Sequence, residues 1–259
     1  MSVRVSVLGS GSKGNCTLLA TEKTRLLIDA GLSCRETYAR LATIGERTDG
    51  LNAVVISHEH TDHINGLRVL ALDGNLPIYI SHATREALSW DTRIQSFEHF
   101  VAGEKFIIGD IEITPFSVPH DAVDPVAFTF DTQGIRISLV TDLGYVSEVV
   151  KQRVKGCHCL IFESNHDLDM LKVSPYPWYV KQRVMSRHGH LSNNATAAFL
   201  AEDLDGAPQV LVLAHLSETN NHPEIARLSA VQALAQRTWG ENTKLHLANQ
   251  TRPTEVFWF

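Results

Sequence analysis

The chain has 259 residues, of which 44% are hydrophobic and 20% are charged. This length and composition predict an ordered globular protein that can bury a full hydrophobic core. Its net charge of −6 argues against a protein that coats nucleic acid through bulk electrostatics, but an enzyme could still bind a few phosphates locally.

The sequence also bears on location. It contains no run of about 18 apolar residues, which excludes a membrane span. The opening letters MSVRVSVLGSG alternate like a β-strand and do not resemble the apolar core of a signal peptide. We therefore expect a cytoplasmic protein. The four cysteines are too few and too unevenly spaced for a disulfide framework, so we expect them to be reduced.

The first third of the chain reads as a β-meander followed by alternating helices and strands. Strands are predicted over 3–7, 17–20 and 25–28, where short apolar runs occur. Ser33 and Glu36 form a capping box, which predicts a helix over 34–44. The next two predicted elements are a buried strand over 53–57 and a helix over 62–72.

The rest of the chain repeats this order of strands and then helices. Strands are predicted over 78–80, 106–108, 111–118, 126–130, 135–141, 159–163 and 210–214. Helices are predicted over 178–187, over 194–204 and from Pro223 onward. Two β-rich halves, each followed by helices, predict an α/β protein (α+β in some schemes) with a four-layer αββα sandwich. No repeat or linker is visible, so we expect residues 1–259 to form a single domain.

The strongest chemical signal is the run Ser57-His58-Glu59-His60-Thr61-Asp62-His63. His58 and His60 lie on a loop that leaves a strand, so both can face one point. Asp62 and His63 begin the next helix and can face a second point beside the first. Imidazole together with carboxylate is the ligand set of zinc, manganese or iron, not of calcium or magnesium. The run therefore predicts a metal site.

Four further polar residues directly follow apolar strands, where the edge of a sheet delivers side chains into a cleft. They are Asp29, His120, Asp142 and His215. Each of them, taken alone, has an ordinary structural explanation. Their occurrence in this order around the HxHxDH run instead favours one shared site.

These residues, in this order, resemble the metallo-β-lactamase superfamily. The resemblance implies the metallo-β-lactamase sandwich and two divalent metal ions, zinc or manganese, with iron also possible. One metal would be held by His58, His60 and His120, and the other by Asp62, His63 and His215. Asp142 would bridge the two ions, and Asp29 would orient a ligand histidine. Two cations roughly 3.5–4 Å apart lower the pKa of a shared water toward 7, which suits the hydrolysis of a phosphodiester or an activated carbonyl.

Further segments narrow the resemblance. The opening SVLGSGSKGN, then FESNHD, PYPW, GHLSN and AHLS resemble the YycJ/WalJ group of exonucleases on this fold. Members of that group are described as 5′→3′ exonucleases on double-stranded DNA, so the resemblance implies a metal-dependent phosphodiesterase that acts on a DNA end. Asp62 and His190 are the candidate catalytic residues. Glu163 is a candidate for orienting a ligand or a phosphate. The candidate substrate-binding residues are Ser12, Asn15, Asn165, His166 and Ser192.

Other features are less specific. The loop over 9–15 could bring backbone N–H groups close to a phosphate, or it could be a plain hairpin turn. The stretch over 176–187 could track a DNA backbone and stack a base, or it could be a solvated helix face; it contains Tyr176, Trp178, Tyr179, Lys181, Arg183 and Arg187. Asp142 and His215 lie too close in the sequence to hold the long insertion of β-CASP nucleases. Binding of DNA must then come from the catalytic face or from a partner.

Alternatives remain open at this level. A small-substrate hydrolase for cyclic phosphodiesters, thioesters or lactones would share the fold, and the compact chain and the pI near 6.1 favour it. A metal-binding regulatory protein would keep the site without activity. The sequence determines neither the native metal, nor the direction of digestion, nor the oligomeric state. For the C-terminal run around Trp258, we expect a docked terminal strand rather than a dimer contact.

Overall fold

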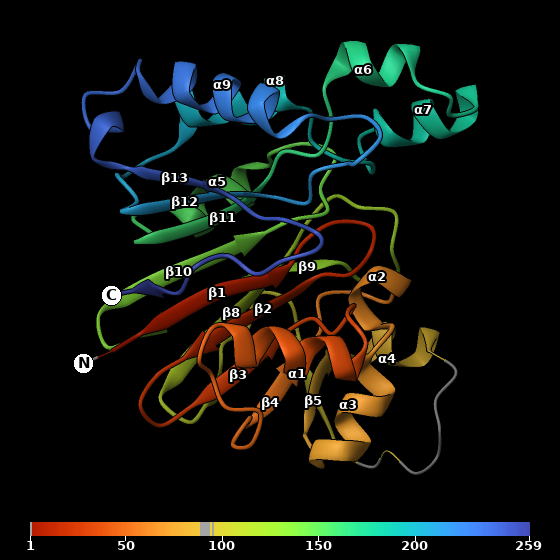
Figure 1. The fold of residues 1–259 in the computed structure, drawn as a ribbon, viewed down its shortest axis with the longest axis vertical. Helices are drawn as coiled ribbons and strands as arrows, with labels where there is room; N and C mark the ends of the chain where they lie inside the picture. The colour runs from red at the N-terminus through yellow and green to blue at the C-terminus, as the bar shows by residue number, and fades with distance from the viewer. Residues whose placement is uncertain (1, 89–93, 95) are drawn as a thin grey trace.

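The computed structural model describes residues 2–88, 94 and 96–259. In this part of the chain, the strands form two sheets of seven strands each, which face one another (Figure 1). The first sheet contains, in spatial order, β14 (Phe257–Trp258), β1 (Arg4–Gly9), β2 (Cys16–Ala20), β3 (Arg25–Ile28), β4 (Ala53–Val55), β5 (Ile78–Ser81) and β6 (Phe97–Phe100). The second contains β13 (Lys244–Leu247), β12 (Val210–Ala214), β11 (Cys159–Glu163), β10 (Ile135–Val140), β9 (Val126–Thr132), β8 (Ile111–Ser117) and β7 (Phe106–Ile108).

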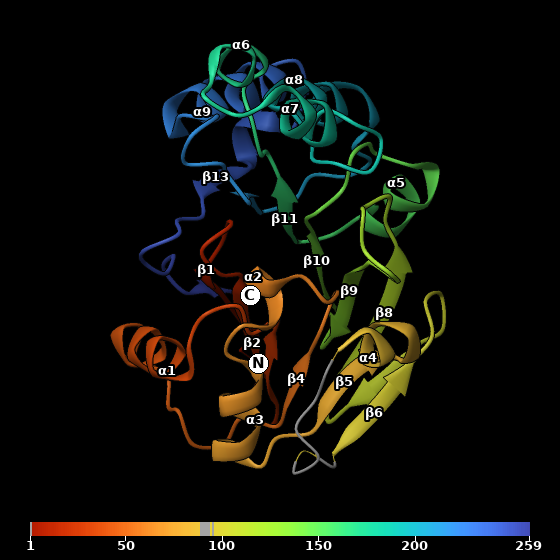
Figure 2. The ribbon, with the colours of Figure 1, turned by 90° about the vertical axis from the view of Figure 1, so that its right-hand side faces the viewer.

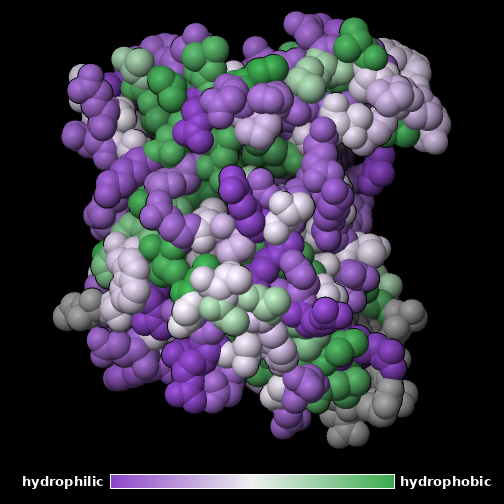
Figure 3. All heavy atoms as spheres, in the orientation of Figure 1, coloured by the Kyte–Doolittle hydropathy of each residue, from purple (hydrophilic) through white to green (hydrophobic). Residues whose placement is uncertain are grey.

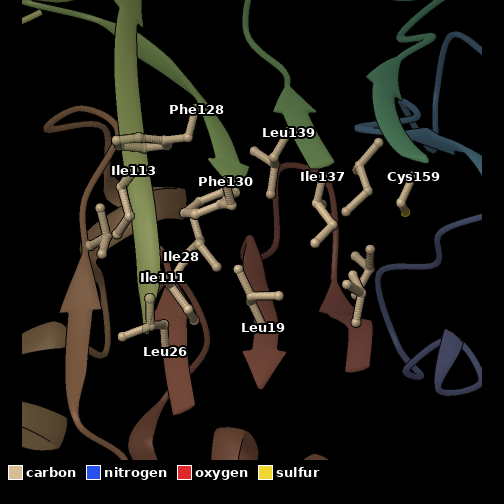
Figure 4. Packing of buried hydrophobic residues seen from close by; sticks show 14 of the residues in the cluster. Leu19, Leu26, Ile28, Ile111, Ile113, Phe128, Phe130, Ile137, Leu139 and Cys159 are labelled. Carbon is tan, nitrogen blue, oxygen red and sulfur yellow. The ribbon is translucent and has the colours of Figure 1, made fainter. Parts of the chain in front are cut away.

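The main core lies between the two sheets. Side chains of Leu19 and Ile28 from the first sheet point toward Phe130, Ile137 and Leu139 from the second (Figure 4). Successive residues of a strand face opposite sides, so alternate residues fill this layer and the others fill a second layer beneath the helices. Because both faces of each sheet are covered, the central strands are nearly continuous apolar runs.

Helices cover the outer face of each sheet, which gives the predicted αββα layers (Figures 1 and 2). The helices on the side of the first sheet are α1 (Cys34–Thr43), α2 (Thr61–Ile64), α3 (Leu67–Gly74) and α4 (His82–Ala87). Those on the side of the second are α5 (Glu148–Val154), α6 (Leu168–Val173), α7 (Trp178–Val184), α8 (Asn193–Ala198), the π-helical turn η1 (Phe199–Asp203), α9 (Pro223–Leu234) and the 3₁₀ turn η2 (Gly240–Asn242). None of the helices in the described ranges has the length and apolar character needed to cross a lipid bilayer.

Most predicted strands are confirmed, and the C-terminal run docks as β14 against β1, with Arg4 opposite Trp258. The continuous helix predicted over 62–72 is wrong, because the chain bends at Gly66 and forms the two helices α2 and α3. The predicted pattern also omitted β6, β13 and the short helices α4, α5 and α6. These elements are short, and their apolar spacing is correspondingly weak.

The polar residues predicted at strand ends gather at one edge of the sandwich. Strands β3 and β4 run parallel in the first sheet, and β10, β11 and β12 run parallel in the second. Carboxyl ends of neighbouring parallel strands share one edge of a sheet, which is where open α/β sheets place their ligands. Asp29, Asp142 and His215 each turn away from their strand with a positive φ, of 60°, 62° and 56°. Aspartate and histidine are among the residues that adopt this conformation more readily than most.

Gly66 allows the bend between α2 and α3 to approach the loop before α1. A Cβ at this position would lie 1.8 Å from the carbonyl oxygen of Leu32. We expect Gly66→Ala to lower the free energy of unfolding by about 1–3 kcal/mol, because the two backbones must move apart. Chemical denaturation measures the change. The exposed Val69→Ala on α3 is the matched control and should change stability by less than about 0.5 kcal/mol. Equal stability of the two variants would contradict the close approach.

Candidate metal centre

A cavity of about 580 Å³ opens at the strand ends described above. Thr61 and Asp62 of α2 line one side of it, and Arg183 and Val184 of α7 line the other. In Figures 1 and 2, α2 lies in the lower half of the molecule and α7 in the upper half. In the space-filling view, the outline of the molecule is indented beneath the lobe that carries α6 and α7 (Figure 3). The predicted site residues therefore lie at the base of a cleft between the two halves.

A first group of three histidines meets at one point of the cavity. His60 Nδ1 lies 3.1 Å from His58 Nε2 and 3.3 Å from His120 Nε2. The other nitrogens of two of these rings are occupied, because His58 Nδ1 lies 3.0 Å from Ser57 Oγ and His120 Nδ1 donates to the carbonyl of Gly189. Three ring nitrogens that converge in this way offer three lone pairs to one cation.

A second group lies beside the first. His63 Nε2 and His215 Nε2 lie 3.6 Å and 3.5 Å from Asp62 Oδ2. The opposite nitrogens are again occupied: His63 Nδ1 lies 2.8 Å from Asp29 Oδ2, and His215 Nδ1 lies 3.0 Å from Glu163 Oε1. Carboxylates behind histidines fix the tautomer and the ring orientation, an arrangement typical of metal-binding imidazoles.

Asp142 lies between the two groups. Its carboxylate oxygens are 3.3 Å from His63 Nε2, 3.5 Å from His215 Nε2 and 3.9 Å from His120 Nε2. The buried Oδ2 receives no hydrogen bond within the described protein. A buried carboxylate oxygen without a donor is costly unless a cation satisfies it. These donors therefore fit divalent metal ions, with Asp142 able to reach toward both groups.

The protonation of the donors agrees with metal binding. Burial lowers the pKa of His58 and of His120, so both imidazoles are neutral near pH 7 and keep a lone pair. Burial disfavours the ionised form of Asp142, but the neighbouring His215 and His63 hold its pKa well below the usual range of a carboxyl. The neutral imidazoles of His58 and His120 thus lie beside an ionised carboxylate.

The second group attracts positive charge strongly. Burial opposes protonation of His63, yet the carboxylates of Asp29 and Asp142 raise its pKa well above the ordinary value. Burial also opposes ionisation of Asp62, but His215 and His63 lower its pKa to about 2. This side of the cavity is therefore an anionic cluster that binds either protons or a cation.

Glu163, at the end of β11, joins the second group to a further histidine. Its Oε1 accepts from His190 Nδ1 at 2.7 Å as well as from His215 Nδ1, and its Oε2 accepts from the backbone N–H groups of Leu143 and Leu191. The side chain is fully buried, which disfavours the charge, but His190 and His215 lower the pKa of Glu163 to about 2. The half-buried His190 lines the cavity.

Comparison with known families gives the relationship. A model described as "Beta-lactamase superfamily domain" matches residues 24–216. The chain belongs to the metallo-β-lactamase superfamily. Within the superfamily, it is 36% identical over 266 residues to the exodeoxyribonuclease YycJ of Bacillus anthracis, which covers 99% of each chain. It is also 38% identical over 242 residues to the exodeoxyribonuclease WalJ of Streptococcus pneumoniae, which covers 92% of this chain and 90% of the relative. It is thus a member of the YycJ/WalJ group.

Solved structures of the superfamily share the fold at lower identity. The metallo-β-lactamase fold protein YhfI of Bacillus subtilis aligns over 100% of both chains with a TM-score of 0.76 and 20% identity. The zinc-bound PqqB of Methylobacterium extorquens aligns over 97% of this chain and 99% of its own, with a TM-score of 0.73 and 18% identity. These likenesses confirm the predicted metallo-β-lactamase sandwich.

The cavity of this metallo-β-lactamase-fold chain includes some of the predicted substrate residues and omits others. Ser12 and Asn165 line it. Asn15 lies behind it, where its side-chain nitrogen contacts Asp62 Oδ2 at 3.1 Å. His166 and Ser192 do not line it. His166 is 1% exposed, and Ser192 caps α8 by accepting from the N–H of Ala195, so this helix start is already satisfied by its own cap.

The basic stretch before His190 divides in the same way. Arg183 lines the cavity, together with Tyr176. Lys181 turns inward, where its Nζ donates to the carbonyl of Lys172, and Arg187 stacks on the ring of Tyr145 at 4.4 Å. Of Lys181, Arg183 and Arg187, Arg183 is the one that lines the cavity, and a role for this stretch in following a DNA backbone stays a prediction. The aromatic side chains of Trp178 and Tyr179 are exposed.

Sequence reasoning missed several residues of the centre. Ser57 donates its hydroxyl to Asp29 and contacts His58, although it directly precedes the HxHxDH run. Asp121 lies 3.5 Å from His120 Nε2 and binds Arg183, and its position next to His120 was the available signal. Asn220 lines the cavity from a loop that carries no recognisable pattern.

Proposed function

We propose that the chain is a metal-dependent exodeoxyribonuclease that removes nucleotides from the 5′ end of double-stranded DNA. The observation that carries the proposal is the full-length similarity to relatives named exodeoxyribonucleases, together with a complete set of His and Asp side chains at the cavity. A net negative chain can act on DNA when cations at the site supply the local positive charge.

We further propose two divalent ions, zinc or manganese, with iron also possible. His58, His60 and His120 would hold one of them. Asp62, His63 and His215 would hold the other, with Asp142 between them. When bound, the ions would supply a water of lowered pKa and positive charge beside the scissile phosphate. Asp29 and Glu163 would then be positioning residues. Asp29 contacts Nδ1 of His63, and Glu163 contacts Nδ1 of His215, while the Nε2 atoms of both rings would face the metal.

His190 would protonate the leaving oxygen. In the reaction, a water loses one proton to the solvent and its oxygen forms a bond to phosphorus. The bond from phosphorus to the leaving oxygen breaks, and that oxygen takes a proton from His190. His190 Nδ1 is held by Glu163 at 2.7 Å, so Nε2 is the nitrogen that remains for the substrate. The same contact with a buried carboxylate fixes the orientation of the imidazole ring. Ser12 and Asn165 line the same cavity and would bind the nucleotide.

One experiment tests the function. The metal-free protein is reloaded separately with manganese and with zinc, and is then incubated with duplex DNA labelled at either the 5′ or the 3′ end. Stepwise release from the 5′ end by one of the loaded forms is the expected result. If neither loaded form releases nucleotides from either end of the DNA but one of them hydrolyses bis(p-nitrophenyl) phosphate or a cyclic phosphodiester, the result contradicts the exonuclease and favours the small-substrate hydrolase.

The role of His190 makes a separate prediction. We expect His190→Ala to lower kcat on DNA by about a hundredfold to ten-thousandfold while metal content stays unchanged. The same variant should lose far less activity on bis(p-nitrophenyl) phosphate, because p-nitrophenolate leaves without a proton. The exposed neighbour His188→Ala is the control. Equal losses on both substrates would show that His190 does not act as the acid.

A further inference from the structure

Cationic side chains at the mouth of the cavity are scarce, which matters for a protein proposed to bind DNA. Among the described residues that line the cavity, two are lysine or arginine: Lys13 and Arg183. Each is paired with a carboxylate. Lys13 Nζ lies 2.6 Å from Glu218 Oε2, and Arg183 Nε binds Asp121 Oδ2.

The two ion pairs differ in how tightly they are tied to the centre. Asp121 also lies 3.5 Å from His120 Nε2, so the Arg183 pair is attached to the first group of histidines. The Lys13 pair is solvent-exposed, with 59% exposure for Lys13 and 48% for Glu218. Exposed ion pairs contribute little to stability, so this pair can exchange partners at low cost.

The backbone beneath Lys13 is nevertheless fixed to the site. The N–H of Lys13 donates to Gln250 Oε1, and the turn around it is held by Asn15, whose Oδ1 accepts from Gly11 and whose side-chain nitrogen reaches Asp62. Glu218 belongs to the loop that begins at His215. The pair therefore connects the loop that contacts Asp62 with the loop that carries His215, at the rim of the cavity.

We propose that Lys13 binds a backbone phosphate of the DNA and that Glu218 is the partner it releases when DNA arrives. This inference rests on the proposed nuclease function and identifies a substrate contact within it. A flexible ammonium on a rigid loop suits a phosphate, which attracts it as a point charge. Glu218 competes with that phosphate and, at the rim, also repels DNA. Removing the cation and removing the carboxylate must then act in opposite directions.

The test uses the metal-loaded protein and a fluorescent duplex whose terminal linkages are phosphorothioates, so that binding is measured without rapid cleavage. We expect Lys13→Ala to weaken binding by about threefold to tenfold and to lower the slope of log K against log salt by about 1. Glu218→Gln should tighten binding by about twofold to fivefold. The double variant should bind DNA more tightly than Lys13→Ala but more weakly than the wild type, because it loses the cation and also the repulsion by Glu218.

The exposed pair Lys105 and Glu112 provides the matched control, because its Nζ to Oε1 distance is also 2.6 Å. Lys105 directly precedes β7 and Glu112 lies on β8, and neither is among the residues that line the cavity. Lys105→Ala and Glu112→Gln should leave DNA affinity unchanged. Equal weakening by Lys13→Ala and Glu218→Gln would identify the pair as a structural tie and overturn the inference. Unchanged binding in both would also overturn it, while wild-type cleavage of DNA would keep the proposed function intact. A wild type that neither binds nor cleaves DNA would instead defeat the proposed function itself.

Discussion

Asp142→Asn is expected to lower kcat/KM on DNA by at least about a thousandfold and to remove bound metal. The carboxylate lies within 3.3 to 3.9 Å of ring nitrogens from both groups, and its Oδ2 has no hydrogen-bond donor in the described protein. An amide at this position would lose the negative charge and would direct an NH₂ group or a neutral oxygen at the cations. Metal per chain, measured by atomic emission, and steady-state kinetics on labelled duplex test the prediction together.

Asparagine is chosen so that the variant and the wild type have the same backbone conformation at position 142. Asp142 has a φ of 62°, and asparagine is one of the residues that tolerates this region, whereas alanine would add strain. Asp131→Asn on β9 is the control, because Asp131 is a partly exposed aspartate that binds Arg136 outside the cavity. An Asp142→Asn protein that retained its metal and its activity would remove Asp142 from the metal centre.

Glu163→Ala is expected to lower the free energy of unfolding by about 3–5 kcal/mol, because it leaves buried polar groups without their partner. The carboxylate is fully buried and accepts from two histidines and from the N–H groups of Leu143 and Leu191. Denaturant titration measures this loss. Glu148→Ala, at an exposed glutamate of α5, is the control and should change stability by less than about 0.5 kcal/mol.

The variant Glu163→Gln distinguishes the contribution of Glu163 to stability from its role in orienting His190 and His215. Glutamine keeps the size of the side chain, but one of its two terminal groups is an NH₂ donor. This NH₂ group must face either the two histidine Nδ1 atoms or the two backbone N–H groups. All of these partners are donors themselves, so one side of the glutamine cannot form its hydrogen bonds. We expect activity or metal affinity to fall by about tenfold to a hundredfold with a smaller loss of stability than in Glu163→Ala. A folded Glu163→Gln protein with wild-type activity and metal content would show that the carboxylate does not orient His190 and His215.

The fold and the meeting of the site residues could largely be predicted, because both follow from local patterns. His58, His60, Asp62 and His63 are close in sequence, and their spacing alone brings them near two points. His120, Asp142 and His215 are distant, but each follows an apolar strand, and the parallel strands of the sandwich bring their ends to one edge. The structure brings the seven side chains together: five of them line one cavity, and the buried His58 and His63 lie in contact with these five. Their role as ligands stays a prediction.

What could not be predicted depends on the direction of individual side chains. His166 and Lys181 occur in polar segments, but both are turned into the protein, where the backbone offers a partner to Lys181. Ser192 is used by its own helix as a cap. The bend at Gly66 depends on the close approach of the Leu32 backbone. This is a contact between distant segments, and the apolar periodicity of the sequence does not predict it.

Each of the two groups of donors draws on both halves of the sandwich. His58, His60, Asp62 and His63 follow β4 of the first sheet, whereas His120 follows β8 and His215 follows β12 of the second. A cation in either group would therefore act as a cross-link between the sheets as well as a cofactor. Ions that bind only the folded protein stabilise it by mass action. The lifetime of this protein in a cell would then follow the supply of its metal, and scarcity would reduce the amount of folded enzyme along with its activity.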